Sequence, residues 1–173
     1  MSKPQFTRRF YRRPAEVLAD FRYILSRRKF IRRTMRELIP PDFRERLMMV
    51  VTEVNGCRYC RSYHRKESLK SGVSEAELRE LLAGLIPQNT PQEEFLALAY
   101  AQKWAENNAK DDPDSWQNLV ETYGEEKAQA IQLILRMIRM GNLSGNLLDF
   151  LIFKLSFGKL GLVQNEERFS IIK

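Results

Sequence analysis

The fold is decided by twenty consecutive residues, which read Glu45-Arg-Leu-Met-Met-Val-Val-Thr-Glu-Val-Asn-Gly-Cys57-Arg-Tyr-Cys60-Arg-Ser-Tyr-His64. The last eight of them hold both cysteines and the single histidine of a 173-residue chain. Three reactive side chains placed at random would rarely fall so close together, so we take this stretch as the functional centre. We expect one helix from Pro41 to about Val54, a break at Asn55-Gly56, and a second helix from near Cys57 to Ser71.

The spacing within the second of these helices brings the reactive groups together. Cys57, Cys60 and His64 are three and four residues apart, which places them on one face of a helix. Cys57 is at the amino end, where unsatisfied backbone N–H groups and the helix dipole favour a thiolate. The two cysteines can form a disulfide with little backbone movement, and Glu45 on the preceding helix can face the same site.

Four interpretations of this cluster compete from the residues alone. A thiol-based redox centre would use two thiols, a base and a carboxylate. A zinc site could draw on Cys57, Cys60, His64 and Glu45, although structural zinc sites usually use a second Cys/His pair, which this chain lacks. A c-type haem attachment is excluded, because Arg61 rather than histidine follows Cys60. The last interpretation is purely structural, with two buried cysteines and a hydrogen-bonded histidine. We favour redox chemistry and expect no metal and no bound cofactor.

The rest of the chain predicts further helices and no strand, since nothing alternates with a period of two residues. Capping signals and glycines bound these helices at Ser74 to about Ala83 (a Ser-Glu-Ala-Glu capping box), Thr90 to about Asn107 (a second such box, with proline next), Asp112 to Gly124, Glu125–Met140, and a final apolar helix after Gly141 and Gly145 to about Phe157. We therefore predict a single all-α domain of seven or eight helices over residues 1–173, with a motif-bearing core at 41–85.

Charge is concentrated at the amino end of the chain. The net charge is +7, and residues 1–46 alone carry 14 Lys/Arg against 5 Asp/Glu, which leaves the remainder slightly acidic. This distribution argues against a general nucleic-acid-binding surface. No apolar run approaches the ~20 residues that span a bilayer, and the first nine residues lack the apolar segment of a secretory signal. We expect a cytoplasmic protein, in which a close cysteine pair is typically redox-active or metal-binding.

Residues 1–40 form a basic extension whose main element is a predicted amphipathic helix from Pro14 to the Pro40-Pro41 pair. Such a helix could lie on an acidic membrane surface or on nucleic acid. It could also pack its apolar face on the domain or on a neighbouring subunit and leave its arginines in water. We favour packing, and so expect neither a membrane nor a nucleic-acid partner.

The motif as a whole resembles the signature of the AhpD-like, or carboxymuconolactone decarboxylase, superfamily. The resemblance rests on Glu45, eleven intervening residues, Cys57, two residues, Cys60, three residues and His64. Asn55-Gly56-Cys57-Arg-Tyr59-Cys60 and Ser68-Leu-Lys-Ser-Gly72-Val extend it, so that it covers residues 41–85. It implies an all-α fold, peroxidase or disulfide-reductase activity, and a homo-oligomer, with trimers and hexamers frequent.

The resemblance also implies roles for the residues. Cys60 would be the attacking thiol, Cys57 the resolving thiol, and Glu45 with His64 the proton relay. The substrate would be a hydroperoxide, and electrons would come from an external dithiol protein, thioredoxin-like or lipoyl-bearing. Helix-end electrostatics instead favour Cys57 as the more acidic thiol, and Tyr59 stands where the hydroperoxidase branch can carry a histidine.

Two other functions stay open. One is a decarboxylase-like lyase that uses His64 and Glu45 without a redox change. The other is a non-catalytic binding protein whose basic amino-terminal helix docks on an acidic partner. A polar stripe of Asn142, Asn146 and Asp149 on the last predicted helix has no assigned chemistry; it would hydrogen-bond neighbouring helices or point into a subunit interface.

Overall fold

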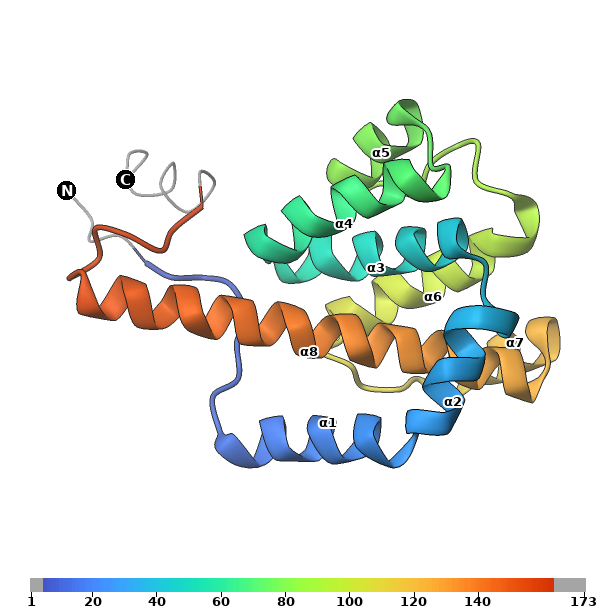
Figure 1. Ribbon diagram of the computed structural model, residues 1–173, viewed down its shortest axis with the longest axis horizontal. Helices are drawn as coiled ribbons and strands as arrows, with labels where there is room; N and C mark the ends of the chain where they lie inside the picture. The colour runs from blue at the N-terminus through green and yellow to red at the C-terminus, as the bar shows by residue number, and fades with distance from the viewer. Residues whose placement is uncertain (1–4, 164–173) are drawn as a thin grey trace.

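The computed structural model describes residues 5–163. Within these residues the chain is all-α, with eight α-helices, one short π-helical turn and no strand (Figure 1), which confirms the predicted fold class. The elements are α1 (Pro14–Ser26), α2 (Arg28–Arg33), η1 (Thr34–Leu38), α3 (Pro41–Asn55), α4 (Arg58–Ser71), α5 (Glu75–Leu82), α6 (Gln92–Glu106), α7 (Pro113–Tyr123) and α8 (Glu125–Leu155).

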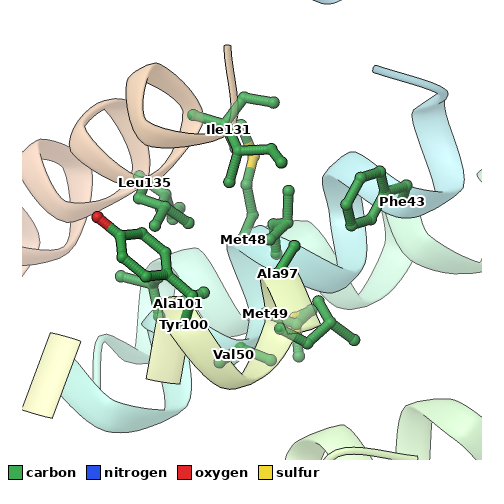
Figure 2. Close-up of a cluster of buried hydrophobic side chains, with 14 of the residues drawn as sticks. Phe43, Met48, Met49, Val50, Ala97, Tyr100, Ala101, Ile131 and Leu135 are labelled. Atoms are coloured by element: carbon green, nitrogen blue, oxygen red, sulfur yellow. The ribbon is translucent and has the colours of Figure 1, made fainter. Parts of the chain in front are cut away.

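Helix α3 is the centre of the domain and packs against α4, α5, α6 and α8. Pro41 occupies its first turn, where a missing N–H costs nothing. Its carboxyl end is set by Gly56, whose φ of 68° is a left-handed conformation that glycine adopts without strain. Figure 2 shows the core built around it, with labelled side chains from α3, α6 and α8: Phe43, Met48, Met49, Val50, Ala97, Tyr100, Ala101, Ile131 and Leu135.

Helix α8 is one continuous helix of 31 residues, and the predicted interruption at Gly141 and Gly145 is wrong. A glycine in a helix interior costs only about 1 kcal/mol relative to alanine, which the packing of so long a helix outweighs. In Figure 1, α8 crosses the whole molecule, with α3 and α4 on one side and α1 on the other. None of the helices in the described part of the chain is long and apolar enough to span a membrane.

The basic amino-terminal region is helical but divided. The single helix predicted between Pro14 and Pro40 is broken after α1, where Arg27 leaves the helical conformation with φ −105° and ψ 17°, and it closes with the π-helical turn. Helix α1 runs along α8 (Figure 1), as the packing interpretation requires. One face of α1 is nevertheless uncovered, because Leu18, Phe21 and Leu25 are each about half exposed.

Of the two predicted capping boxes, one is confirmed and the other is wrong. The Ser74 hydroxyl accepts a hydrogen bond from the Glu77 N–H, and the Glu77 carboxylate accepts one from the Ser74 N–H. The box predicted at Thr90 does not form, because Pro91 itself precedes the first residue of α6 and the Thr90 hydroxyl has no hydrogen-bond partner.

An ion cluster fastens α3 to α5 and α6. The Arg46 side chain is almost fully buried, and its guanidinium lies 2.9 Å from Asp42, 3.2 Å from Glu77 and 3.1 Å from Glu94. A buried guanidinium needs such partners, because an unpaired charge in the interior is costly. The cluster therefore fixes α3, which carries Glu45 of the motif, relative to the neighbouring helices.

Candidate active site

The two cysteines lie at the amino end of α4, directly after the turn at Gly56. Cys57 is the residue that caps the helix, and its sulfur accepts a hydrogen bond from the Cys60 N–H at 3.4 Å. Both cysteines are free thiols, and their Sγ atoms lie 3.0 Å apart. A disulfide has an S–S length of about 2.05 Å, so the pair can be oxidised by a movement of about 1 Å.

Glu45 and His64 form a hydrogen-bonded pair that joins α3 to α4. The Nδ1 atom of His64 lies 2.7 Å from Oε2 of Glu45, and both side chains are largely buried between α3 and α4. The Tyr63 ring packs edge-on against the imidazole at 5.0 Å. A carboxylate on Nδ1 fixes the ring and favours the tautomer with its proton on that atom, which leaves Nε2 as the accepting nitrogen. His64 lies one helical turn after Cys60, so its imidazole is on the thiol face of α4.

The thiol pair is electrostatically asymmetric. A hydrogen bond shared with Cys60 lowers the pKa of Cys57 to about 7; burial opposes this shift, and the backbone N–H groups of Cys60 and Tyr59 support it. The pKa of Cys60 is raised, first by its hydrogen bond to Cys57, and then by burial and by the charge on Cys57. The helix-end argument from the sequence gives the same order. Exposure runs the other way, because Cys57 is only 1% exposed and Cys60 is partly exposed.

Two glycines of α8 lie against the sulfur atoms, and at one of them, Gly145, the sulfur needs the missing side chain. A Cβ atom built on Gly145 would lie 2.8 Å from the Cys57 Sγ, closer than real Cβ contacts allow, and 3.3 Å from the Tyr59 ring. A Cβ atom on Gly141 would lie 3.8 Å from the Cys60 Sγ, an ordinary contact. The glycines that were expected to break the helix therefore form the flat wall against which the thiols rest.

The amide residues of the polar stripe join α8 to the end of α3. Asn142 donates to the Thr52 hydroxyl at 3.1 Å and accepts from the Asn55 amide at 3.2 Å. Its side chain also hydrogen-bonds Cys60, which partly offsets the rise in the pKa of that thiol. Asn146 donates to the Asn55 carbonyl at 2.7 Å. Of the two roles suggested from the sequence, these residues therefore hydrogen-bond neighbouring segments of their own domain.

Asp149, the third residue of the stripe, is fully buried and is a site residue that the sequence analysis missed. Its carboxylate accepts from Arg58 at 2.7 Å, from the Tyr59 hydroxyl at 2.8 Å, and from Arg8 of the amino-terminal segment at 2.7 Å. The signal in the sequence was the recurrence of polar residues at positions 142, 146 and 149 of an otherwise apolar helix. That pattern does not identify Arg8 as a partner, since it lies 141 residues away.

The donor set favours sulfur chemistry. Among the residues that the structure describes, no three or more His, Cys, Asp and Glu side chains come together as a metal ion would require. The fold and the site thus define a helical protein with a vicinal dithiol beside a carboxylate–histidine pair.

Comparison with known proteins gives one family match. Residues 22–103 match the family model described as Carboxymuconolactone decarboxylase family, which is the AhpD-like superfamily. This region is similar to that family, and the resemblance inferred from the motif is confirmed there. The match contains Glu45, both cysteines and His64, and ends before α8 begins. Neither the curated proteins nor the solved structures give a match to the chain.

Proposed function

We propose that the protein is a thiol-dependent oxidoreductase that reduces hydroperoxides, or disulfides of partner proteins, through Cys57 and Cys60. The observation that carries this proposal is a pair of free sulfur atoms 3.0 Å apart at the start of α4, the helix that also carries His64 with its 2.7 Å hydrogen bond to Glu45. A purely structural pair would have no use for the acid–base group or for the lowered pKa of Cys57. The family match over residues 22–103 supports a catalytic role, since members of that family are often enzymes.

Accessibility supports Cys60 as the attacking thiol. A hydroperoxide must touch the sulfur it oxidises, and Cys57 is buried whereas Cys60 is partly exposed. Cys60 must first lose its proton. His64 follows one helical turn later on the same face of α4, so we propose that its imidazole takes this proton and leaves Cys57, whose sulfur is 3.0 Å from that of Cys60, as the thiolate. Glu45 stabilises the imidazolium that forms when His64 takes the proton.

In the proposed cycle a hydroperoxide oxidises the two thiols to a disulfide. The Cys60 thiolate attacks the terminal oxygen of the hydroperoxide, the O–O bond breaks, and the leaving alkoxide takes the proton held by His64 to give an alcohol. Cys60 is then a sulfenic acid. The Cys57 thiolate attacks the Cys60 sulfur and expels hydroxide, which is protonated to water. The two thiols have supplied two electrons and are left as a disulfide.

Return to the dithiol requires an external reductant. We propose a protein dithiol, thioredoxin-like or lipoyl-bearing, which attacks the more exposed Cys60 sulfur and resolves the mixed disulfide by exchange. The cycle needs a compartment that keeps thiols reduced, so we propose a cytoplasmic location.

We also propose that the protein works as a homo-oligomer. The support is a set of apolar side chains on α1 and on the carboxyl-terminal half of α8, of which six are about half exposed or more: Leu18, Phe21, Leu25, Leu148, Leu151 and Leu155. Apolar surfaces of this kind mark interfaces in soluble proteins. Light scattering coupled to gel filtration tests the proposal, and a monomer at micromolar concentration would contradict it.

Peroxide turnover tests the function directly. Reduction of cumene hydroperoxide in the presence of a dithiol should be lost in Cys60→Ser. In Cys57→Ser the reaction should stop at the Cys60 sulfenic acid, which dimedone traps as a mass adduct on that residue. Full turnover by Cys60→Ser, or a dimedone adduct on Cys57 in the Cys60→Ser variant, would refute the assigned order.

A lyase is the second candidate, because the matched family includes decarboxylases and the Glu45–His64 pair exists independently of the cysteines. The double variant Cys57→Ser/Cys60→Ser separates the two functions. Conversion of a carboxylated lactone by this variant at the wild-type rate would favour the lyase, whereas loss of peroxide reduction alone would favour the oxidoreductase.

A further inference from the structure

A second charged cluster lies near Cys57, and it contains neither Glu45 nor His64. Its centre is Asp149, whose carboxylate has no exposed surface and accepts from the guanidinium groups of Arg8 and Arg58 and from the hydroxyl of Tyr59. Arg8 also donates to the Gly161 carbonyl. The cluster therefore ties the amino-terminal segment, the start of α4 and the end of α8 to one buried carboxylate.

This cluster encloses the Cys57 sulfur. Gly145 lies one helical turn before Asp149, and a Cβ atom there would be 2.8 Å from the Cys57 Sγ. Arg58 and Tyr59 follow Cys57 directly in the chain. The Cγ and Cδ atoms of Arg8 approach to 3.2 Å from a Cβ atom built on Gly56, the residue before Cys57. Cys57 is thus covered from the amino-terminal segment, from α4 and from α8.

We propose that Asp149 is a positioning residue for the thiol pair, and that the charge balance between Asp149, Arg8 and Arg58 decides how readily Cys57 carries the thiolate. The inference rests on the proposed function in one respect, namely that Cys57 acts as a thiolate. A lone buried carboxylate here would repel a thiolate, whereas two guanidinium groups turn the cluster into a net positive charge.

The charges of this cluster come from three elements. Asp149 is on α8, Arg8 is on the amino-terminal segment and Arg58 is on α4. Asp149 acts on Cys57 through its charge, which raises the pKa of that thiol. Tyr59 adds a hydroxyl donor to the same carboxylate.

Arg58 allows the proposal to be tested in a folded protein. Its side chain is 43% exposed, so Arg58→Met removes one cation without opening the core. Arg61 is a matched control: it lies one turn further along α4, is 49% exposed, and pairs with Glu53, which makes no contact with Asp149. Arg58→Lys keeps the charge and should restore the wild-type behaviour.

The measurement is the pH profile of iodoacetamide alkylation of Cys57, in a Cys60→Ala background that leaves one thiol. Arg58→Met should slow alkylation at pH 7 by about three- to tenfold and move the midpoint upward, since one pKa unit is a tenfold change in thiolate. Asp149→Asn should move the midpoint downward. Arg61→Met and Arg58→Lys should match the background. Circular dichroism monitors folding in each variant.

Opposite shifts in Arg58→Met and Asp149→Asn support the inference, because general loosening of the site would move both the same way. An alkylation rate of Arg58→Met at pH 7 that lies within twofold of the rate of Arg61→Met overturns the inference. This comparison can be made even if Asp149→Asn fails to fold. Alkylation does not depend on peroxide. A shifted profile without peroxide turnover therefore refutes the proposed function alone, and a flat profile with turnover refutes this inference alone.

Discussion

Replacement of Gly145 by alanine tests whether α8 is the wall of the thiol site. The new Cβ atom would lie 2.8 Å from the Cys57 Sγ, so the sulfur must retreat by at least about 0.6 Å to reach an ordinary contact. Cys57 has little room to do so, because it is 1% exposed. Gly141→Ala is the matched control, since its Cβ atom would meet the Cys60 Sγ at 3.8 Å.

The two variants share one energy term and differ in another. Both replace glycine by alanine inside a helix, which stabilises the helix by about 1 kcal/mol. Only Gly145→Ala overpacks a buried site, at a cost of about 1–3 kcal/mol. We therefore expect Gly141→Ala to be up to about 1 kcal/mol more stable than the wild type, and Gly145→Ala to be less stable than Gly141→Ala by about 1–3 kcal/mol.

Urea denaturation of the reduced proteins gives these free energies of unfolding. A second assay follows loss of free thiols after addition of diamide, which reports how fast the disulfide closes. Gly145→Ala should close it more slowly, because its Cys57 sulfur is displaced, whereas Gly141→Ala should retain the wild-type rate. If Gly145→Ala matches Gly141→Ala in both stability and closure rate, the packing of α8 on the thiols is refuted.

Three further predictions concern the ion cluster, the thiol titration and the proton relay. Arg46→Met should lower the free energy of unfolding by about 3–5 kcal/mol, because it leaves the buried Glu94 and its neighbours without their cation. Arg33→Met breaks an exposed pair with Glu126 and should lower it by less than about 1 kcal/mol in the same urea experiment. Equal losses in the two variants would contradict this argument. The pKa of Cys57 is lowered from an ordinary value of about 9 to about 7 in the folded protein, so this stabilisation is lost as the pH falls through 7 and grows as the pH rises toward 9. Above pH 9 the raised pKa of Cys60 removes stability again, because that thiol then ionises in the unfolded chain only. The reduced wild type should therefore gain up to about 3 kcal/mol of stability between pH 7 and 9 relative to Cys57→Ser/Cys60→Ser, and parallel pH curves for the two proteins would rule this out. Glu45→Gln should reduce peroxide turnover by at least about tenfold with the fold intact. Glu67→Gln, which changes a partly exposed carboxylate on α4, should not. Retained activity in Glu45→Gln would remove the relay from the mechanism.

The parts of the site that lie close together in the chain could be predicted from sequence. Asn55-Gly56 marks a turn, because glycine accepts the left-handed conformation that ends α3. The spacing of Cys57, Cys60 and His64 then determines which side chains share a face of α4. Glu45 follows from the same turn, since the tight connection folds α3 back on α4. All of this is local geometry, within twenty residues.

What the sequence did not predict depends on contacts across the chain. Gly141 and Gly145 predict a helix break because their cost to a helix is visible locally, while Cys57, whose sulfur needs the space at Gly145, is 88 residues earlier in the chain. Arg8 and Asp149 meet only because the amino-terminal segment crosses α8. Thr90 failed as a cap because Pro91 took the position before the helix, a choice set by how the chain enters the core.

The structure also joins two arguments that disagreed at the level of sequence. Helix-end electrostatics favour a thiolate on Cys57, whereas the family resemblance implies attack by Cys60. Both hold if the resting pair carries its charge on the buried Cys57 and its proton on Cys60, the thiol that is partly exposed and lies one helical turn before His64. The proton that must leave before attack is then on the same face of α4 as the base that receives it. Cys57 meanwhile is already a thiolate when the sulfenic acid forms, so the resolving step needs no further deprotonation.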